Sequence, residues 1–466
     1  MSEAVATSQQ GLVGKYKPYP EYKDSGVEWL GDMPSHWLTS KLRYMFTFGK
    51  GLTITKENLR DEGIPCVNYG EVHSKYGFEV DPTKHPLRCV EEDYLKTSSS
   101  SVLNIGDFVF ADTSEDIDGS GNFTQLTSDV VTFAGYHTII VRPIDKSSHR
   151  FFAYLFDSKE FRTAIRHAVK GVKVFSITQA ILRGADIWLP SQDERQRIAA
   201  FLDYETARID RLIAQQQRLI ELLKEKRQAV ISHAVTKGLN PDASMKDSGV
   251  EWLGQVPEHW VVKQYRYATQ LFRGKFGHRP RNDPALYDGP YPFIQTGDIA
   301  RTGKFITEYS QTLNELGRQV SQRFPAGTLV MAIAANIGDT AILEFDAYCP
   351  DSVVGFKPRE DLDIEFLRLT FAAALQALEQ TSTQSTQANL NLDRVGSLYA
   401  AFPPYEEQLD LIDAVARIES TYNQLELVAL QGIHLLQERR TVLISAAVTG
   451  KIDLRGWTPP ADEVAA

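Results

Sequence analysis

An internal repeat sets the architecture of this chain of 466 residues. Residues 23–31 read KDSGVEWLG, and the same letters return at residues 246–254. A second match, at a different spacing, relates residues 227–236 to residues 440–449. Single residues around these segments also recur, namely Pro34, His36 and Trp37 as Pro257, His259 and Trp260, and Pro190 and Glu194 as Pro403 and Glu407. The chain therefore consists of two halves, each with a short signature, a divergent middle and a long helical segment.

The two middles are expected to be compact domains of mixed α and β structure, because each has about 150 residues and short apolar runs between Gly and Pro. The tryptophans of the signatures, Trp29, Trp37, Trp252 and Trp260, are expected to anchor cores rather than to stack on bases. Residues 65–72 resemble 292–299, and 106–110 resemble 327–331, and all four are predicted strands; residues 151–169 and 364–378 are predicted helices.

The segments 194–235 and 406–448 are predicted to be long helices that pair with each other. The first has no Gly or Pro, and both carry apolar residues at heptad spacing, although the second is a weaker copy with Gly432 in its middle. An apolar stripe on a long helix needs a partner, and the duplicated helix is favoured over a second copy of the chain. The predicted seam comprises Leu202, Ile209, Ile213, Ile220, Leu223 and Val230 of the first helix and Val415, Tyr422, Ile433, Leu436 and Leu443 of the second.

Composition excludes several classes of protein. The net charge of −10 argues against a polybasic nucleic-acid coat, although local basic loops still permit DNA binding. Three scattered cysteines without CxxC spacing argue against a disulfide framework or a zinc finger and favour the reducing cytoplasm. No signal peptide and no apolar run long enough for a membrane helix is apparent, so a cytoplasmic location is expected.

Motifs for catalysis are absent from the sequence. It has no dinucleotide-binding glycine motif after a strand, no phosphate-binding GxxxxGK[ST] and no zinc-binding HExxH. Residues 402–405 read FPPY, which resembles the catalytic loop of amino-methyltransferases, but Phe402 cannot hold an amino group as the polar first residue of that loop does. No metal site or bound cofactor is predicted, and a non-catalytic protein is favoured over a self-contained methyltransferase or nuclease.

An acidic loop in the first middle carries Asp112, Glu115, Asp116 and Asp118 beside two glycines. Its spacing does not match a calcium-binding EF-hand loop. A solvated loop is the favoured interpretation, and a hydrogen-bond acceptor for cytosine is the alternative if the loop enters a DNA groove.

Basic loops with glycines are the candidate DNA-binding elements. Residues 272–281 of the second middle read FRGKFGHRPR, and the segment that begins at Phe48 holds the same place in the first middle. Glycine allows a backbone to approach a phosphate closely, and arginine can bind guanine through two hydrogen bonds. Two polar segments just before the long helices add lysines and amides that can bind phosphate or adenine. The candidates are Lys50, Lys56, Lys170, Lys173, Arg273, Lys275, His278, Arg279, Arg281, Gln384, Gln387 and Asn389.

The doubled KDSGVEWLG signature, with its Pro and His-Trp, resembles the specificity (S) subunit of type I restriction-modification systems over nearly the whole chain. The resemblance implies two target-recognition domains that each read one half of a split site in double-stranded DNA. It also implies antiparallel helices that hold these domains apart and dock two methyltransferase (M) subunits, joined by restriction (R) subunits. S-adenosylmethionine, ATP and magnesium would then be bound by the partner subunits, and a coiled-coil scaffold that presents two adaptor domains is the alternative.

The predicted organisation follows from the repeat and the resemblance together. A fixed helical rod would set the spacing between the two half-sites. The predicted parts are an N-terminal arm with the first signature (1–37), recognition domain 1 (38–189), a central helix (190–239), the second signature (240–260), recognition domain 2 (261–402), a C-terminal helix (403–452) and a tail (453–466).

Overall fold

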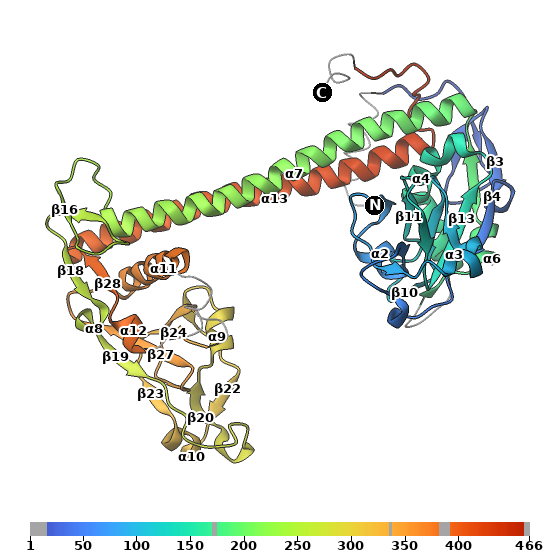
Figure 1. Cartoon of the computed structure of the whole chain (residues 1–466). Coiled ribbons are helices and arrows are strands. Elements are labelled where there is room, and N and C mark those ends of the chain that lie inside the picture. Colours follow the sequence, from blue (N-terminus) through green and yellow to red (C-terminus); the bar gives the residue numbers. More distant parts are fainter. Residues whose placement is uncertain (1–15, 170–174, 335–337, 382–391, 461–466) are drawn as a thin grey trace. The chain divides into compact units, whose positions relative to one another are not determined.

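The computed structural model describes residues 16–169, 175–334, 338–381 and 392–460, without the side chains of residues 376–381. The chain divides into two compact units, Met1–Gln217 with Leu430–Ala466, and Arg218–Ala429. Each unit contains one of the two middles and one part of each long helix, α7 (Gln192–Lys237) and α13 (Tyr405–Val448) (Figure 1). Both units mix helices and strands, as the sequence predicts.

Each unit contains a five-stranded sheet, and the two sheets have the same topology. In both, four neighbouring strands pair antiparallel and the last edge strand pairs parallel to its neighbour. The order in the first unit is β4 (Phe46–Lys50), β13 (Thr138–Pro143), β9 (Phe108–Ala111), β11 (Phe123–Leu126), β6 (Phe78–Val80). The order in the second is β19 (Thr269–Arg273), β27 (Val353–Pro358), β24 (Leu329–Ala332), β25 (Thr340–Leu343), β21 (Phe305–Ile306).

A four-stranded sheet is likewise repeated, with one parallel pair in the centre and an antiparallel pair on each side. Its order is β7 (Cys89–Val90), β5 (Ile64–Val67), β12 (Thr132–Ala134), β8 (Val102–Leu103) in the first unit. The second unit has β22 (Gln311–Leu313), β20 (Tyr287–Phe293), β26 (Ala347–Cys349), β23 (Gln322–Phe324). The two middles are therefore copies of one fold.

One predicted strand in each middle turns into a short helix halfway along. Residues 65–67 belong to β5, but the chain then forms α2 (Tyr69–Ser74), and β20 is followed in the same way by α9 (Thr296–Arg301). The reason is a capping box: the Asn68 N–H donates to the Glu71 carboxylate at 3.1 Å, and the Gln295 N–H donates to Asp298 at 2.9 Å. The strand prediction for the second half of these segments was wrong because this cap outweighs the apolar pattern.

The core of each unit lies between the five-stranded sheet and the helices that follow it. In the first unit α4 (His149–Asp157) and α5 (Lys159–Ala168) bury aromatic rings such as Phe152 and Phe156 against Phe46 and Phe108 of the sheet. In the second unit α11 (Ile364–Thr381) places Phe371 on Tyr265, with ring centroids 3.9 Å apart. Both helical predictions, near 151–169 and 364–378, are confirmed.

The remaining described elements are short. The helices are η1 (Leu42–Tyr44), η2 (Lys56–Asn58), α3 (Tyr94–Thr97), η3 (Ser99–Ser101), η4 (Lys146–Ser148), α6 (Gln179–Gly184), α8 (Tyr265–Ala268), η5 (Pro284–Leu286), α10 (Glu315–Val320) and α12 (Leu392–Gly396). The strand pairs are β1 (Tyr22–Asp24) with β2 (Asp32–Pro34), β16 (Met245–Asp247) with β17 (Gln255–Pro257), β3 (Leu38–Lys41) with β15 (Asp186–Leu189), β18 (Val261–Gln264) with β28 (Tyr399–Phe402), and β10 (Thr113–Ser114) with β14 (Phe175–Ser176).

The repeated signature forms a hairpin that holds the start of a long helix. In the first unit the Trp37 indole N–H donates to the Glu194 carboxylate at 3.1 Å, and the Tyr19 hydroxyl donates to the same oxygen at 2.6 Å. His36 Nε2 donates to the other carboxylate oxygen at 3.0 Å. Burial, together with the hydrogen bond to Glu194, raises the pKa of the Tyr19 phenol above its usual value, so this hydroxyl remains a donor. We call this set of contacts the carboxylate clamp.

The second unit repeats the carboxylate clamp. The Trp260 indole N–H donates to Glu407 at 3.0 Å, and His259 Nε2 donates to the same carboxylate at 2.7 Å. Both glutamates lie in the first turn of a long helix, where the helix dipole favours a negative charge. The recurrence of His-Trp in the signatures and of Glu at the helix starts therefore has one cause.

The four signature tryptophans do not share one environment. Trp37 and Trp260 are fully buried, as expected of core anchors. Trp252 is half-buried, and Trp29 is 36% exposed, so the core prediction was wrong for Trp29. Of the four tryptophans, Trp37 and Trp260 are the two that donate to the glutamates at the helix starts.

Within each unit the parts of α7 and α13 run antiparallel. In the first unit Arg440 lies 3.3 Å from the Asp210 carboxylate. In the second, Lys224 pairs with Glu426 at 3.0 Å, and Arg227 donates to Asn423 at 2.7 Å. Every residue of the predicted seam is buried or half-buried, and Leu202, Ile209 and Leu443 belong to the core of the first unit. Pairing along the whole seam remains a prediction.

Candidate nucleic-acid interface

Lys50 and Arg273 occupy the same position in the two units, at the end of β4 and at the end of β19. Both side chains are exposed and form no ion pair or hydrogen bond with any residue that the structure describes. Each unit therefore presents a free cation at the same strand end.

The glycines after these cations have an internal role that the sequence did not reveal. A Cβ on Gly51 would lie 1.9 Å from the Gly135 carbonyl oxygen, and one on Gly274 would lie 1.8 Å from that of Pro350. The backbone of each strand end must pack against the loop that leads into the next strand, β13 or β27. This packing requires glycine at both positions. It accounts for Gly51 and Gly274 without any approach of a phosphate to the backbone.

The basic loop at residues 272–281 is less basic than its sequence indicates. Arg281 donates to the Asp351 carboxylate at 2.6 Å, and Arg279 lies 3.6 Å from the same group. His278 pairs with Asp283 at 3.0 Å. The hydrogen bond from the Ala285 N–H lowers the pKa of the Asp283 carboxyl most, and the bond from His278 lowers it further. Of the candidate cations in the described part of this loop, Arg273 and Lys275 are exposed and unpaired.

The other candidates from the sequence divide into two groups. Lys56 lies in η2 with an exposed side chain. Lys170, Lys173, Gln384, Gln387 and Asn389 lie outside the described residues. All of the DNA contacts assigned to these residues remain predictions.

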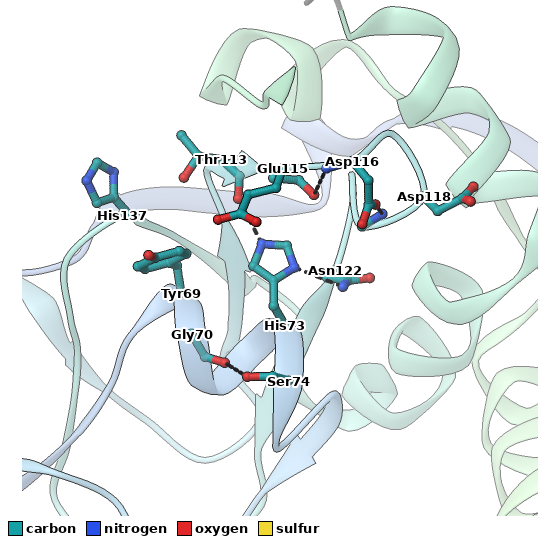
Figure 2. Close-up of a pocket in the computed structure, with 12 residues that line it drawn as sticks. Tyr69, Gly70, His73, Ser74, Thr113, Glu115, Asp116, Asp118, Asn122 and His137 are labelled. Carbon is teal, nitrogen blue, oxygen red and sulfur yellow. Dashed lines mark hydrogen bonds between the residues drawn. The ribbon is translucent and has the colours of Figure 1, made fainter. Parts of the chain in front are cut away.

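A cavity of about 680 Å³ in the first unit was missed from the sequence, and we call it the α2 pocket. Figure 2 shows Tyr69 and His73 on its α2 side, and Glu115 and Asp116 on the loop side. Its other lining residues are Gly70, Ser74, Thr113, Ser114, Asp118, Gly119, Asn122 and His137. The acidic loop was noted in the sequence, but α2 was expected to be a strand, so the two segments were not brought together.

The His73 ring links the two sides of the α2 pocket. Its Nε2–H donates to the Thr113 carbonyl at 2.8 Å, and its Nδ1 accepts from the Asn122 amide at 3.0 Å, which is the pattern of a neutral imidazole (Figure 2). The Asn122 amide oxygen in turn accepts from Arg162 of α5 at 2.8 Å. These bonds fix the acidic loop relative to α2.

The corresponding helix of the second unit keeps the buried residue of α2 and changes residues that are half-buried or exposed. Val72 corresponds to the equally buried Ile299, and Glu71 of the capping box corresponds to Asp298. By contrast Tyr69, His73 and Ser74 correspond to Thr296, Ala300 and Arg301. One scaffold thus presents two different sets of side chains at its surface.

Among the described residues, no three His, Cys, Asp or Glu side chains are grouped so that they could hold a metal ion. Within the same residues, no helix has both the length and the apolar character needed to cross a bilayer.

The two domains have one topology, a cation at the same strand end, and different side chains on the same short helix, so the chain is a duplication of one domain whose two copies have diverged. Residues 34–222 and 264–427 match the family described as the type I restriction modification DNA specificity domain, and the chain belongs to this family. The family predicted from the doubled signature is therefore confirmed, and with it the role in DNA sequence specificity.

Relatives extend the match along the chain. The specificity subunit of the type I restriction enzyme EcoKI from Escherichia coli is 20% identical over 445 residues, which cover 91% of this chain and 90% of that protein. The StySPI specificity subunit from Salmonella potsdam is 24% identical over 226 residues, 48% of this chain and 47% of that protein.

Solved structures share the fold. A chain from the type I R-M system has a TM-score of 0.63 and 15% identity, over 89% of this chain and 98% of its own length. The HsdS subunit from Thermoanaerobacter tengcongensis has a TM-score of 0.51 and 15% identity, over 90% and 98%.

Proposed function

We propose that this chain is the specificity subunit of a type I restriction-modification complex and that each recognition domain reads one half of a bipartite DNA site. The observation that carries the proposal is the duplication itself. Both halves match the same DNA specificity domain and have the same sheet topology, yet α2 and α9 differ in residues that are half-buried or exposed. Two copies of one scaffold with different surfaces are suited to two different half-sites.

The chemistry of the complex belongs, in this proposal, to partner subunits. Methyltransferase subunits would bind S-adenosylmethionine, and restriction subunits would bind ATP and magnesium. This chain would supply sequence recognition and the surface on which the methyltransferase subunits assemble. One solved structure that shares the fold of this chain belongs to a type I R-M system and describes the assembly of that complex.

The proposal is tested by base-resolved mapping of adenine methylation in a host genome that carries the methyltransferase gene with or without this chain. We expect a split motif that appears only when the chain is present. Methylation that is identical in both strains, with a methyltransferase shown to be active, would contradict the proposal and would favour a scaffold that does not read DNA.

The long helices carry exposed apolar side chains that suit a protein partner. On α13 of the second unit Leu425, Leu427 and Val428 are 48%, 55% and 64% exposed. The part of α7 in that unit exposes Leu219 and Leu222, and the first unit exposes Leu212, Leu430 and Leu435. These residues support docking of the methyltransferase subunits on the helices.

Replacing both Leu425 and Val428 by lysine is expected to raise the dissociation constant for the methyltransferase subunit about a hundredfold. The two side chains lie on one face of the helix, at i and i+3, and burial of each is worth about 1.5–3 kcal/mol. The measurement is the dissociation constant for the methyltransferase subunit by titration calorimetry. The matched control is Leu239→Lys, which alters a 51% exposed leucine just beyond α7. Equal effects of both changes would contradict docking at this face.

Replacing both Arg273 and Lys275 by alanine is expected to lower the salt dependence of DNA binding. Each phosphate contact contributes roughly 0.9 to the slope of log K against log salt, so the slope should fall by about two. The measurement is affinity for a DNA duplex carrying both half-sites, across a salt series, with the assembled complex. Lys226→Ala removes an exposed cation from α7 and serves as the control. An unchanged slope would remove this loop from the DNA interface.

A further inference from the structure

We propose that the α2 pocket reads a cytosine in the half-site bound by the first unit, with the Glu115 carboxylate as acceptor for the N4 amino group. The inference rests on the proposed function and adds the base and the residue. The pocket is a cavity of about 680 Å³ bounded by an aromatic ring, two histidines, an asparagine and the acidic loop. It is therefore large enough to accept base edges or a protruding group.

Glu115 differs from the other acidic residues of its loop. Asp112 pairs with His137 at 3.2 Å, Asp116 accepts from the Gly119 N–H at 2.6 Å, and Asp118 pairs with Arg166 at 3.2 Å. Within the described structure Glu115 is exposed at the pocket and makes no hydrogen bond or ion pair. Its two oxygens are free to accept hydrogen bonds from a ligand.

A free carboxylate in a DNA-binding face selects its ligand by charge. It repels phosphate, so it is suited to a groove and to an N–H donor on a base edge. In the major groove cytosine presents its N4 amino group, whereas the adenine amino group lies beside the N7 acceptor, which a carboxylate would repel. Guanine presents acceptors there. Cytosine is therefore the base that the geometry and charge favour.

Gly70 is an independent indication that a ligand approaches α2 closely. It lines the α2 pocket in the first turn of α2, and an added Cβ would meet no described atom within 4 Å. Gly297 of α9 is the corresponding residue, and a Cβ there would meet only the end of the Arg301 side chain, at 3.8 Å. Neither glycine has a positive φ. No contact with a described residue explains these glycines, whereas a nucleic acid that lies against each helix does.

The lining of the α2 pocket is held in place before any ligand arrives. The hydrogen bonds of His73 to Thr113 and Asn122 tie the acidic loop to α2, and Arg162 anchors Asn122. A loop fixed in this way loses little conformational freedom on binding, which favours discrimination between bases. The end of β4, where Lys50 lies, is linked to the wall of the α2 pocket, because the Gly51 N–H donates to the carbonyl of Thr138, the residue after His137.

The test is the methylation motif of the complete complex with Glu115→Gln. The motif of the unaltered complex is determined first, so that failure of the proposed function, which gives no split motif, is distinguished from failure of this inference. Glutamine has the same shape, but it also donates and binds adenine through N6 and N7. We expect preference for cytosine at one position of one half-site to fall at least tenfold, with adenine accepted there and with the other half-site and spacing unchanged.

Glu92→Gln, a change of an exposed glutamate that does not line the α2 pocket, is the matched control and should leave the motif intact. An unaltered motif for Glu115→Gln would overturn the inference. So would a uniform loss of methylation without a change of sequence preference, or a change in both half-sites.

Gly70→Ala gives a second measurement that separates binding from folding. We expect the thermal midpoint to stay the same or to rise, because alanine favours the helix, while methylation at the cognate sites falls at least tenfold. A fall in both quantities would indicate that the glycine is structural. Full methylation would show that nothing approaches this helix closely, and either result would remove the support that Gly70 gives.

Discussion

Replacing Glu194 by alanine is expected to destabilise the first unit by about 2–4 kcal/mol, because an unmade hydrogen bond of a buried donor costs about 1–3 kcal/mol. The Glu194 carboxylate is 4% exposed and accepts from the buried Trp37 indole and the Tyr19 hydroxyl, both of which would lose their acceptor. The measurement is denaturant unfolding of the whole chain, followed by tryptophan fluorescence and by circular dichroism. A transition assigned to the first unit should shift to lower denaturant.

Two further variants make this prediction sharper. Glu407→Ala removes the clamp of the second unit, where the carboxylate side chain is 32% exposed, so a smaller loss of about 1–2 kcal/mol is expected. Glu225→Ala alters an exposed residue in the middle of α7 and should change stability by less than about 0.5 kcal/mol. If Glu194→Ala behaved like Glu225→Ala, the carboxylate clamp would not hold the helix start.

Insertion of one heptad into each long helix, after Gln216 in α7 and after Ile433 in α13, is expected to abolish methylation at the original sites and to create a motif with a longer spacer. Seven residues add about 10 Å to a helix, and B-DNA rises 3.4 Å per base pair, so the spacer should grow by roughly three base pairs. A full heptad preserves the register of the seam. Adenine methylation mapped across a genome gives the spacer directly, and both half-sites should remain the same.

The matched control for this insertion lengthens the chain without lengthening the helices. Seven residues placed after Pro241, in the exposed segment between α7 and β16, should leave the spacer unchanged. Altered half-sites with the original spacer in the heptad variant would reject a helical ruler. A changed spacer in the loop variant would also contradict it, since it would assign the spacing to the connection.

Much of the frame was predictable because its signals are local. The doubled signature located the two halves, and heptad spacing without Gly or Pro located α7, which begins at Gln192 and ends at Lys237. Weak similarity within the middles predicted strands in mixed α and β domains. The strand orders, which only the structure gives, show that the two middles share one topology. The predicted domain ranges follow one another along the chain and remain a proposal. The first compact unit, by contrast, combines two stretches of the chain, and the second is a single stretch.

The candidate site was less predictable because side-chain partners are distant in sequence. The sequence does not show that Arg281 is paired, because its partner Asp351 lies far along the chain. Gly274 suggested phosphate approach, although its reason is the Pro350 carbonyl. The α2 pocket is not predictable from the sequence because the pattern of α2 predicts a strand and because the loop on the other side of the pocket lies 40 residues further on. The hydrogen bond between His73 and Thr113 joins α2 to this loop.

The sequence by itself determined the duplication, the long helices and the family, because repeats, periodicity and signatures are properties of order along the chain. Only the tertiary structure decided why His-Trp and Glu recur together, which cations are unpaired among the described residues, and which residues that reach the surface differ between two domains of the same topology. Those properties depend on distances between groups that folding brings together, and hydrogen bonds and ion pairs act only at such short range.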